Sequence, residues 1–162
     1  MTGHDLPSVV ALGGALQSLA GRFDAARVPQ LMHSEPACPA ALRPDATALV
    51  DAVGSLRPVL DAGGRALTSW TYAVARLDRE QAAIEADAAQ YGFVIEHGRI
   101  APGSGPRQVV SAPAEAGRQA ALAALRRRLL LVAEERARVD AAVRAELTEL
   151  TAAATGVADG LR

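Results

Sequence analysis

The chain lacks lysine and asparagine, and among its 162 residues it has 1 Cys, 1 Trp, 2 Tyr and 2 Phe. Every basic residue is arginine, and a GC-rich genome produces this preference for arginine over lysine without a functional reason. The single Cys38 excludes an internal disulfide, so nothing requires an oxidising compartment. The scarcity of aromatic residues argues against a wide globular core and favours helices that approach closely through Leu, Val and Ala.

Charge and hydropathy exclude two further classes of partner. The formal net charge of -1 removes the usual electrostatic attraction to nucleic acid or to anionic membranes. No stretch approaches the ~20 apolar residues that a membrane-spanning helix needs. Residues 1–6 carry Asp5 and no basic residue, and Gly13 and Gly14 interrupt the apolar stretch that follows. The sequence therefore predicts a cytoplasmic protein without a cleavable signal peptide.

A long apolar stripe at steps of three and four residues indicates one long helix over residues 45–91. Its members are Leu49, Val53, Leu56, Leu60, Gly63, Leu67, Trp70, Val74, Leu77, Ile84, Ala88 and Tyr91. Pro58 removes one helical hydrogen bond, and Gly63 with Gly64 adds backbone freedom. Since the register passes through Pro58 without slipping, we expect a kink there, with a break at the two glycines as the alternative.

Two more helices are expected, over residues 8–27 and 114–155. Prolines exclude a regular helix between residues 28 and 44, and residues 101–113 form a linker rich in Gly, Pro and Ser. Residues 93–100 favour a very short hairpin that turns at His97 and Gly98. The fold class predicted for residues 1–162 is all-α. It is a single elongated domain in which three main helices form an antiparallel bundle or coiled coil.

Few residues suggest chemistry. His33, Glu35 and Cys38 lie close together, but they do not form a recognised zinc-ligand pattern and no second cluster completes them. The sequence has no phosphate-binding glycine loop and no nucleophile elbow. The three arginines of the run Arg126 to Arg128 spread around a helix, which favours solvent-exposed side chains over a single basic patch. Arg136 interrupts the apolar stripe of the last helix. We therefore expect no cofactor, no metal site and no enzymatic activity.

The long helix supplies the candidate residues for binding a partner. Trp70 lies on the apolar stripe, where core filling is the plainer interpretation, and Tyr72 lies beside it, off the stripe. The residues predicted to contact a partner are Trp70, Tyr72, Val74, Leu77, Ile84 and Tyr91.

Residues 66–80, ALTSWTYAVARLDRE, continue through Tyr91 and the Gly98 turn into a Pro/Gly linker and an Ala/Arg/Leu helix. This order resembles the helical N-terminal domains of actinobacterial type VII secretion substrates related to the WXG superfamily, in which the long helix often carries a proline, as Pro58 does here. The family's Trp-x-Gly turn has no counterpart in residues 36–41, PACPAA. Its Tyr-x-x-x-Asp/Glu export signal is also unmatched, since Arg76 and Ile95 stand at that spacing after the two tyrosines.

The resemblance implies a secretion substrate or a helical targeting partner, exported without a cleavable signal peptide. Together with the long stripe, it predicts an interaction module that forms a heterodimer with another helical protein. The alternative is a structural coiled coil that self-assembles as a homodimer.

Overall fold

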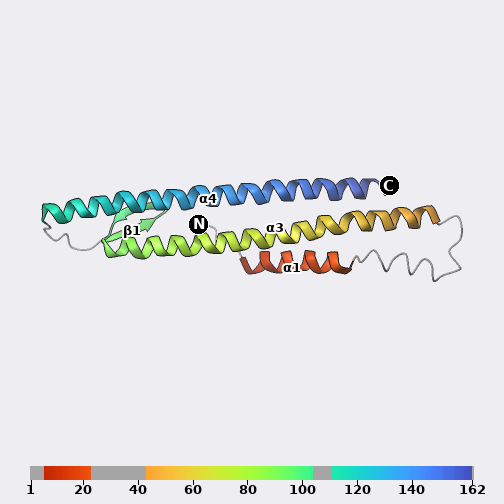
Figure 1. Ribbon diagram of the computed structural model, residues 1–162, viewed down its shortest axis with the longest axis horizontal. Helices are drawn as coiled ribbons and strands as arrows, with labels where there is room; N and C mark the ends of the chain where they lie inside the picture. The colour runs from red at the N-terminus through yellow and green to blue at the C-terminus, as the bar shows by residue number, and fades with distance from the viewer. Residues whose placement is uncertain (1–5, 23–42, 104–110, 162) are drawn as a thin grey trace. The chain divides into compact units, whose positions relative to one another are not determined.

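A computed structural model describes residues 6–22, 43–103 and 111–161 of the chain (Figure 1). Its elements are α1 (Leu6–Arg22), α3 (Arg43–Gln90), β1 (Phe93–Glu96), β2 (Arg99–Pro102) and α4 (Ala112–Asp159). The prediction of an all-α fold with three main helices and a small hairpin is confirmed. The predicted end of the first helix, near residue 27, lies outside the described residues.

α3 is one continuous helix of 48 residues that includes Pro58, Gly63 and Gly64. The break that the two glycines could have caused does not occur. Proline in a helix interior typically costs ~3 kcal/mol, so tertiary packing on both sides must offset that cost. α3 begins two residues before the predicted start, whereas α4 extends past both ends of its predicted range.

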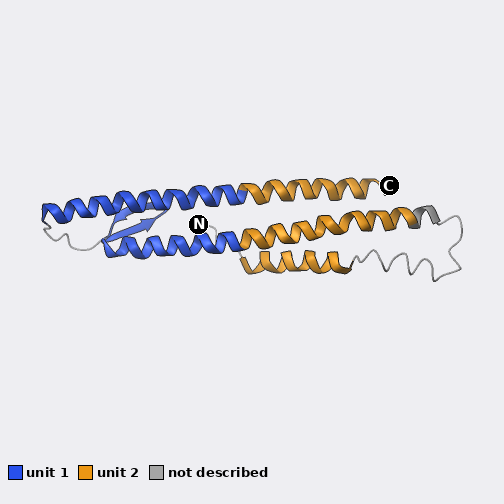
Figure 2. Ribbon diagram, viewed as in Figure 1, with its two compact units in different colours: residues 1–3, 72–140 blue, residues 4–71, 141–162 orange. Residues whose placement is uncertain are grey.

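The chain's internal contacts group into two compact units, and α3 and α4 each contribute residues to both (Figure 2). Unit 1 contains Tyr72–Asp140, with the hairpin between its two helical segments. Unit 2 contains α1, the part of α3 up to Thr71 and the part of α4 from Ala141 onward.

The hairpin of unit 1 is antiparallel, with Phe93 opposite Pro102 and Glu96 opposite Arg99. Its two-residue turn is the predicted one, and His97 (φ 51°) and Gly98 (φ 75°) both have positive φ. Positive φ at both positions is the signature of a type I′ turn, whose twist matches that of the strands. The backbone N–H of Gly103 donates to the carbonyl of Gly92 at 2.8 Å and closes the base of the hairpin.

Unit 1 has a closed apolar core between α3, α4 and the hairpin. Its buried members are Leu77, Ile84, Ala88, Phe93, Leu125 and Val132, and the partly buried Ile95, Ile100 and Leu122 pack against them. The guanidinium of Arg118 lies 4.8 Å from the centre of the Phe93 ring, a cation–π distance. An isolated two-stranded hairpin is barely stable, so the burial of Phe93 explains how this one holds.

Two cross-helix ion pairs show the register of α3 against α4 in unit 1. Arg136 pairs with Asp78, and Arg128 pairs with Asp87 at 2.5 Å. From the first pair to the second, the residue number rises along α3, from Asp78 to Asp87, and falls along α4, from Arg136 to Arg128. The two segments are therefore antiparallel. Arg136 therefore interrupts the apolar stripe of α4 in order to form an ion pair with α3. Arg128 is not simply a solvated residue, because it also pairs with α3.

Unit 2 packs through small residues. A Cβ built on Gly64 of α3 would lie 2.8 Å from the carbonyl oxygen of Gly13 in α1, so the two backbones meet directly. A Cβ on Gly63 would lie 3.7 Å from the side chains of both Leu16 and Leu150. The three helices of unit 2 therefore converge on this glycine pair. Within the described residues, no helix is both long enough and apolar enough to cross a membrane.

Candidate interaction surfaces

The structure divides the residues predicted to bind a partner into two groups. Val74, Leu77 and Ile84 are almost fully buried within the chain, so this fold leaves them no surface to offer. Tyr72 is 74% exposed, and Tyr91 is also exposed. Trp70 is half-buried and engaged in an interaction of its own. The tyrosines are therefore the members of the predicted set that a partner can reach.

Unit 1 carries a groove between α3 and α4, which we call the lateral groove. Its lining residues are Arg76, Leu77, Glu80, Leu131, Val132, Glu134, Glu135 and Arg138, and its volume is about 220 Å³. The core residues Leu77 and Val132 form its apolar base, whereas the other lining residues except Leu131 are charged. Because Leu77 and Val132 are almost fully buried, the groove offers mainly charged contacts along its rim, with Leu131 as its exposed apolar side chain.

The rim charges of the lateral groove are partly paired within the chain. Glu135 forms an ion pair with Arg138, and its carboxylate lies 3.8 Å from the guanidinium of Arg76. Among the described residues, neither Glu80 nor Glu134 has an ion-pair partner. Two carboxylates of the rim therefore remain available to a cation from outside.

Leu131 is the residue of this groove that the sequence analysis missed. It is 63% exposed, and its neighbour Leu130, which does not line the groove, is 58% exposed. The signal was the run Leu129, Leu130 and Leu131. Three consecutive helical residues span ~200°, which is wider than an apolar stripe of ~100°, so such a run must place leucines outside the core.

α1 presents the second candidate surface. Arg22 is the one charged residue among its 17, and it stands in the last turn. The side facing α3 contains Gly13 and Ala20, which are buried. Leu12 and Leu19 are exposed on one flank of α1, and Val10 is exposed on the other flank. A helix that is apolar on more than one side usually has a packing partner on each.

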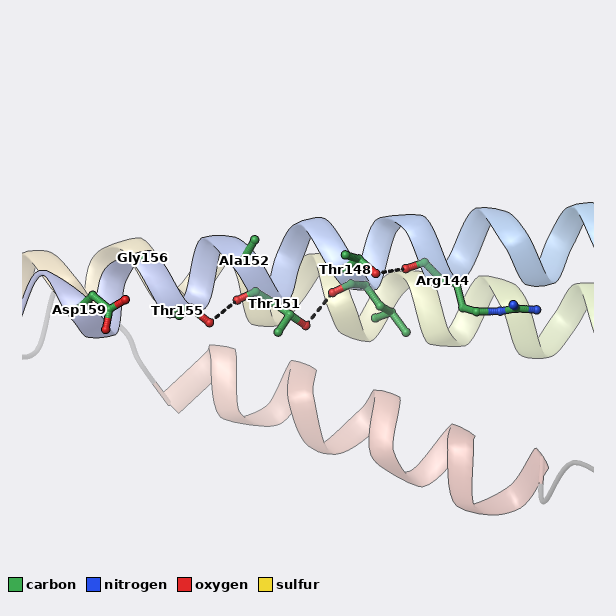
Figure 3. A pocket seen from close by; sticks show the side chains of 8 residues that line it. Arg144, Thr148, Thr151, Ala152, Thr155, Gly156 and Asp159 are labelled. Atoms are coloured by element: carbon green, nitrogen blue, oxygen red, sulfur yellow. Dashed lines mark hydrogen bonds between the residues drawn. The ribbon is translucent and has the colours of Figure 1, made fainter.

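α4 of unit 2 carries a shallow groove of about 770 Å³ (Figure 3). Thr148, Thr151 and Thr155 lie along it, and each hydroxyl donates to the carbonyl four residues earlier at 2.7 to 2.9 Å. Hydroxyls that are satisfied by their own helix provide little recognition. A further groove of about 340 Å³ lies between α1 and α3 beside Pro58 and has no distinctive chemistry.

The described residues hold no group of three or more His, Cys, Asp or Glu side chains arranged to bind a metal ion. The candidate ligands His33, Glu35 and Cys38 lie outside the described residues. Comparison with family models, curated proteins and solved structures finds no match to this chain. The surfaces of the two units are therefore what indicates a function.

Proposed function

We propose that the chain is a non-enzymatic interaction module that pairs with another helical protein through the outer face of α1. The observation that carries the proposal is the combination of an almost uncharged helix with two exposed apolar side chains, Leu12 and Leu19, which are seven residues apart and so share one face. Burying such side chains is favourable, whereas charged residues would oppose it. The fitting partner is a helix with a complementary apolar stripe.

The length of α1 determines how much surface a partner can bury on it. Seventeen residues make a helix about 25 Å long. Association costs at least ~4 kcal/mol in lost translational and rotational freedom, and two partly exposed side chains barely offset that cost. The partner must therefore lie along the whole helix, so that the interface approaches the ~1,200 Å² of buried surface at the lower end of specific complexes.

The sequence resemblance supports a place for this module in type VII secretion, as a substrate or as a helical targeting partner. In that setting it acts in the cytoplasm before export without a cleavable signal peptide, and its partner supplies the tyrosine export signal that it lacks.

Co-expression with the helical proteins encoded beside its gene tests the proposal, with complex formation measured by light scattering after size-exclusion chromatography. We expect a one-to-one complex that Leu12→Glu or Leu19→Glu abolishes, because a carboxylate would be buried without a partner. Leu49→Glu in α3 is the matched control, since Leu49 and Leu12 are both 54% exposed. Absence of any complex, or equal loss with Leu49→Glu, would contradict the proposal.

A further inference from the structure

The side of α4 that faces away from the core of unit 1 carries an exposed leucine between two charged residues. Leu130 is 58% exposed and lies about 150° around the helix from the buried Leu125 and Val132. Arg127 stands three residues before it and Glu134 four residues after it, and both are exposed. Among the residues that the structure describes, neither Arg127 nor Glu134 forms an ion pair. Both charges are therefore available to a partner.

Small residues continue this side of α4 in both directions. Ala123 and Ala137 are exposed, and each lies seven residues from Leu130, so the three share one face. Alanine side chains allow a neighbouring helix to approach to the short end of the range of about 8–10 Å between packed helix axes. We call this set of residues the outer patch. Its members are Ala123, Arg127, Leu130, Glu134 and Ala137.

The charges of the outer patch are placed symmetrically about one point of α4. Arg127 and Glu134 lie about 5 Å before and after the point between Leu130 and Leu131. They are only about 20° apart around the helix, because seven residues complete almost two turns. A two-fold axis through this point, perpendicular to α4 and in the plane of contact, therefore sets Arg127 of one copy level with Glu134 of the other. The same rotation brings Leu130 of the two copies together.

We propose that the outer patch is a self-pairing surface, on which α4 of a second copy packs antiparallel to α4 of the first. Leu130 contacts Leu130 at the axis, and an Arg127–Glu134 pair lies on each side of it along the helices. Ala123 of each copy lies within one residue of the level of Ala137 of the other, so small side chains continue the contact. One patch thus supplies both halves of the interface, as isologous pairing requires.

The charge pattern favours this occupant and this direction. Parallel pairing of the same face would set Arg127 against Arg127 and Glu134 against Glu134, and like charges in contact are destabilising. A helix of unrelated sequence would not require this chain to carry opposite charges at equal distances from one leucine. The inference goes beyond the proposed function, because the outer patch belongs to α4 of unit 1 and not to α1.

The mass of the chain, measured by sedimentation equilibrium up to millimolar concentration, tests the inference. The patch is small, so we expect a reversible homodimer with a Kd of about 0.1–1 mM and a monomer at micromolar concentration. Leu130→Asp should raise this Kd at least about tenfold, because it places two carboxylates together at the axis. Leu131→Asp is the matched control, since Leu131 is 63% exposed and points about 100° away. A monomer at every concentration, or an equal effect of both substitutions, would overturn the inference.

A charge exchange separates an interface role from a structural one. Arg127→Glu and Glu134→Arg should each raise the Kd, because each sets like charges opposite one another. The double variant should restore the dimer, since each copy then presents the exchanged pair. Failure of this rescue, with helix content unchanged by circular dichroism, would overturn the assigned contacts.

Cysteine cross-linking tests the antiparallel direction. In a Cys38→Ser background, chains with Arg127→Cys are mixed with chains that carry Glu134→Cys. We expect a disulfide dimer in the mixture and none in either variant alone, because the same residue of two copies lies about 10 Å apart along the helices and Cα atoms more than ~7 Å apart cannot be bridged. A disulfide dimer that either variant forms equally well alone would overturn the arrangement.

The two pairing surfaces are tested independently. Leu130→Asp should leave the complex with a helical partner intact, because that complex forms through α1. A chain that stays monomeric at millimolar concentration but still binds such a partner would refute self-pairing and leave the proposed function standing.

Discussion

Gly64 of α3 packs directly on the backbone of Gly13 in α1. A Cβ built on Gly64 would lie 2.8 Å from the carbonyl oxygen of Gly13 and 2.5 Å from Cγ of Gln17. Glycine at a helix interior ordinarily weakens the helix, so its presence here reflects the need for close approach. The hydroxyl of Thr68 donates to the Gly64 carbonyl at 2.8 Å and lies on the same contact. Unit 2 therefore depends on the absence of one methyl group.

Gly64→Ala should lower the free energy of unfolding by about 1–3 kcal/mol, because the new methyl group forces the two helices apart. Gly54→Ala in the same helix is the control, since a Cβ there would meet no atom within 4 Å. That substitution should raise stability by about 0.5–1 kcal/mol through helix propensity. Urea unfolding of both variants measures the difference. A Gly64→Ala variant as stable as Gly54→Ala would show that α1 does not pack as described.

Ile84→Ala should destabilise the chain by about 2–5 kcal/mol, because Ile84 is fully buried in the core of unit 1 and its loss leaves a cavity. Leu49→Ala, at an exposed position of the same helix, should change the free energy of unfolding by less than about 0.5 kcal/mol. Denaturant titration compares the two. Similar costs would mean that the core does not lie where the apolar register places it.

The cross-helix pair of Asp78 and Arg136 should contribute modestly. Its carboxylate is half-exposed, so a double-mutant cycle with Asp78→Ala and Arg136→Ala should give a coupling of about 0.2–1 kcal/mol. High salt should reduce that coupling through screening. A coupling of zero at low salt would contradict the pairing.

Gly98→Ala should cost about 1 kcal/mol, because φ at this position is 75° and a side chain is strained there. His97→Asn should instead stabilise the turn slightly, since asparagine tolerates positive φ better than histidine does. Thermal unfolding followed by circular dichroism tests both variants. If Gly98→Ala had no effect, the type I′ turn would be wrong.

Apolar periodicity was sufficient to predict the helices, since the stripe from Leu49 to Tyr91 continues through Pro58 as the helix does. The hairpin was also predictable, because His97 and Gly98 supply the two residues that a tight turn needs. Both predictions rest on local patterns, which the chain's own residues determine.

Tertiary contacts were not predictable in the same way. From the sequence alone, Gly63 and Gly64 indicate a break in the helix. In the structure they are a packing site, because Gly64 contacts the backbone of α1. From the sequence alone, Arg136 only interrupts an apolar stripe, because its partner Asp78 is 58 residues away in the chain. The lateral groove combines residues from both helices, so its charge pattern emerges only when the register of α3 and α4 is known.

The most direct test of the central claim, that this chain functions by helix pairing, is its mass in solution by sedimentation equilibrium, alone and mixed with the helical protein encoded beside its gene. We expect the mixture to contain a complex whose mass equals one copy of each chain, above the 16.7 kDa of this chain. A mixture in which each protein keeps the mass that it has alone, 16.7 kDa for this chain, would contradict helix pairing with that protein.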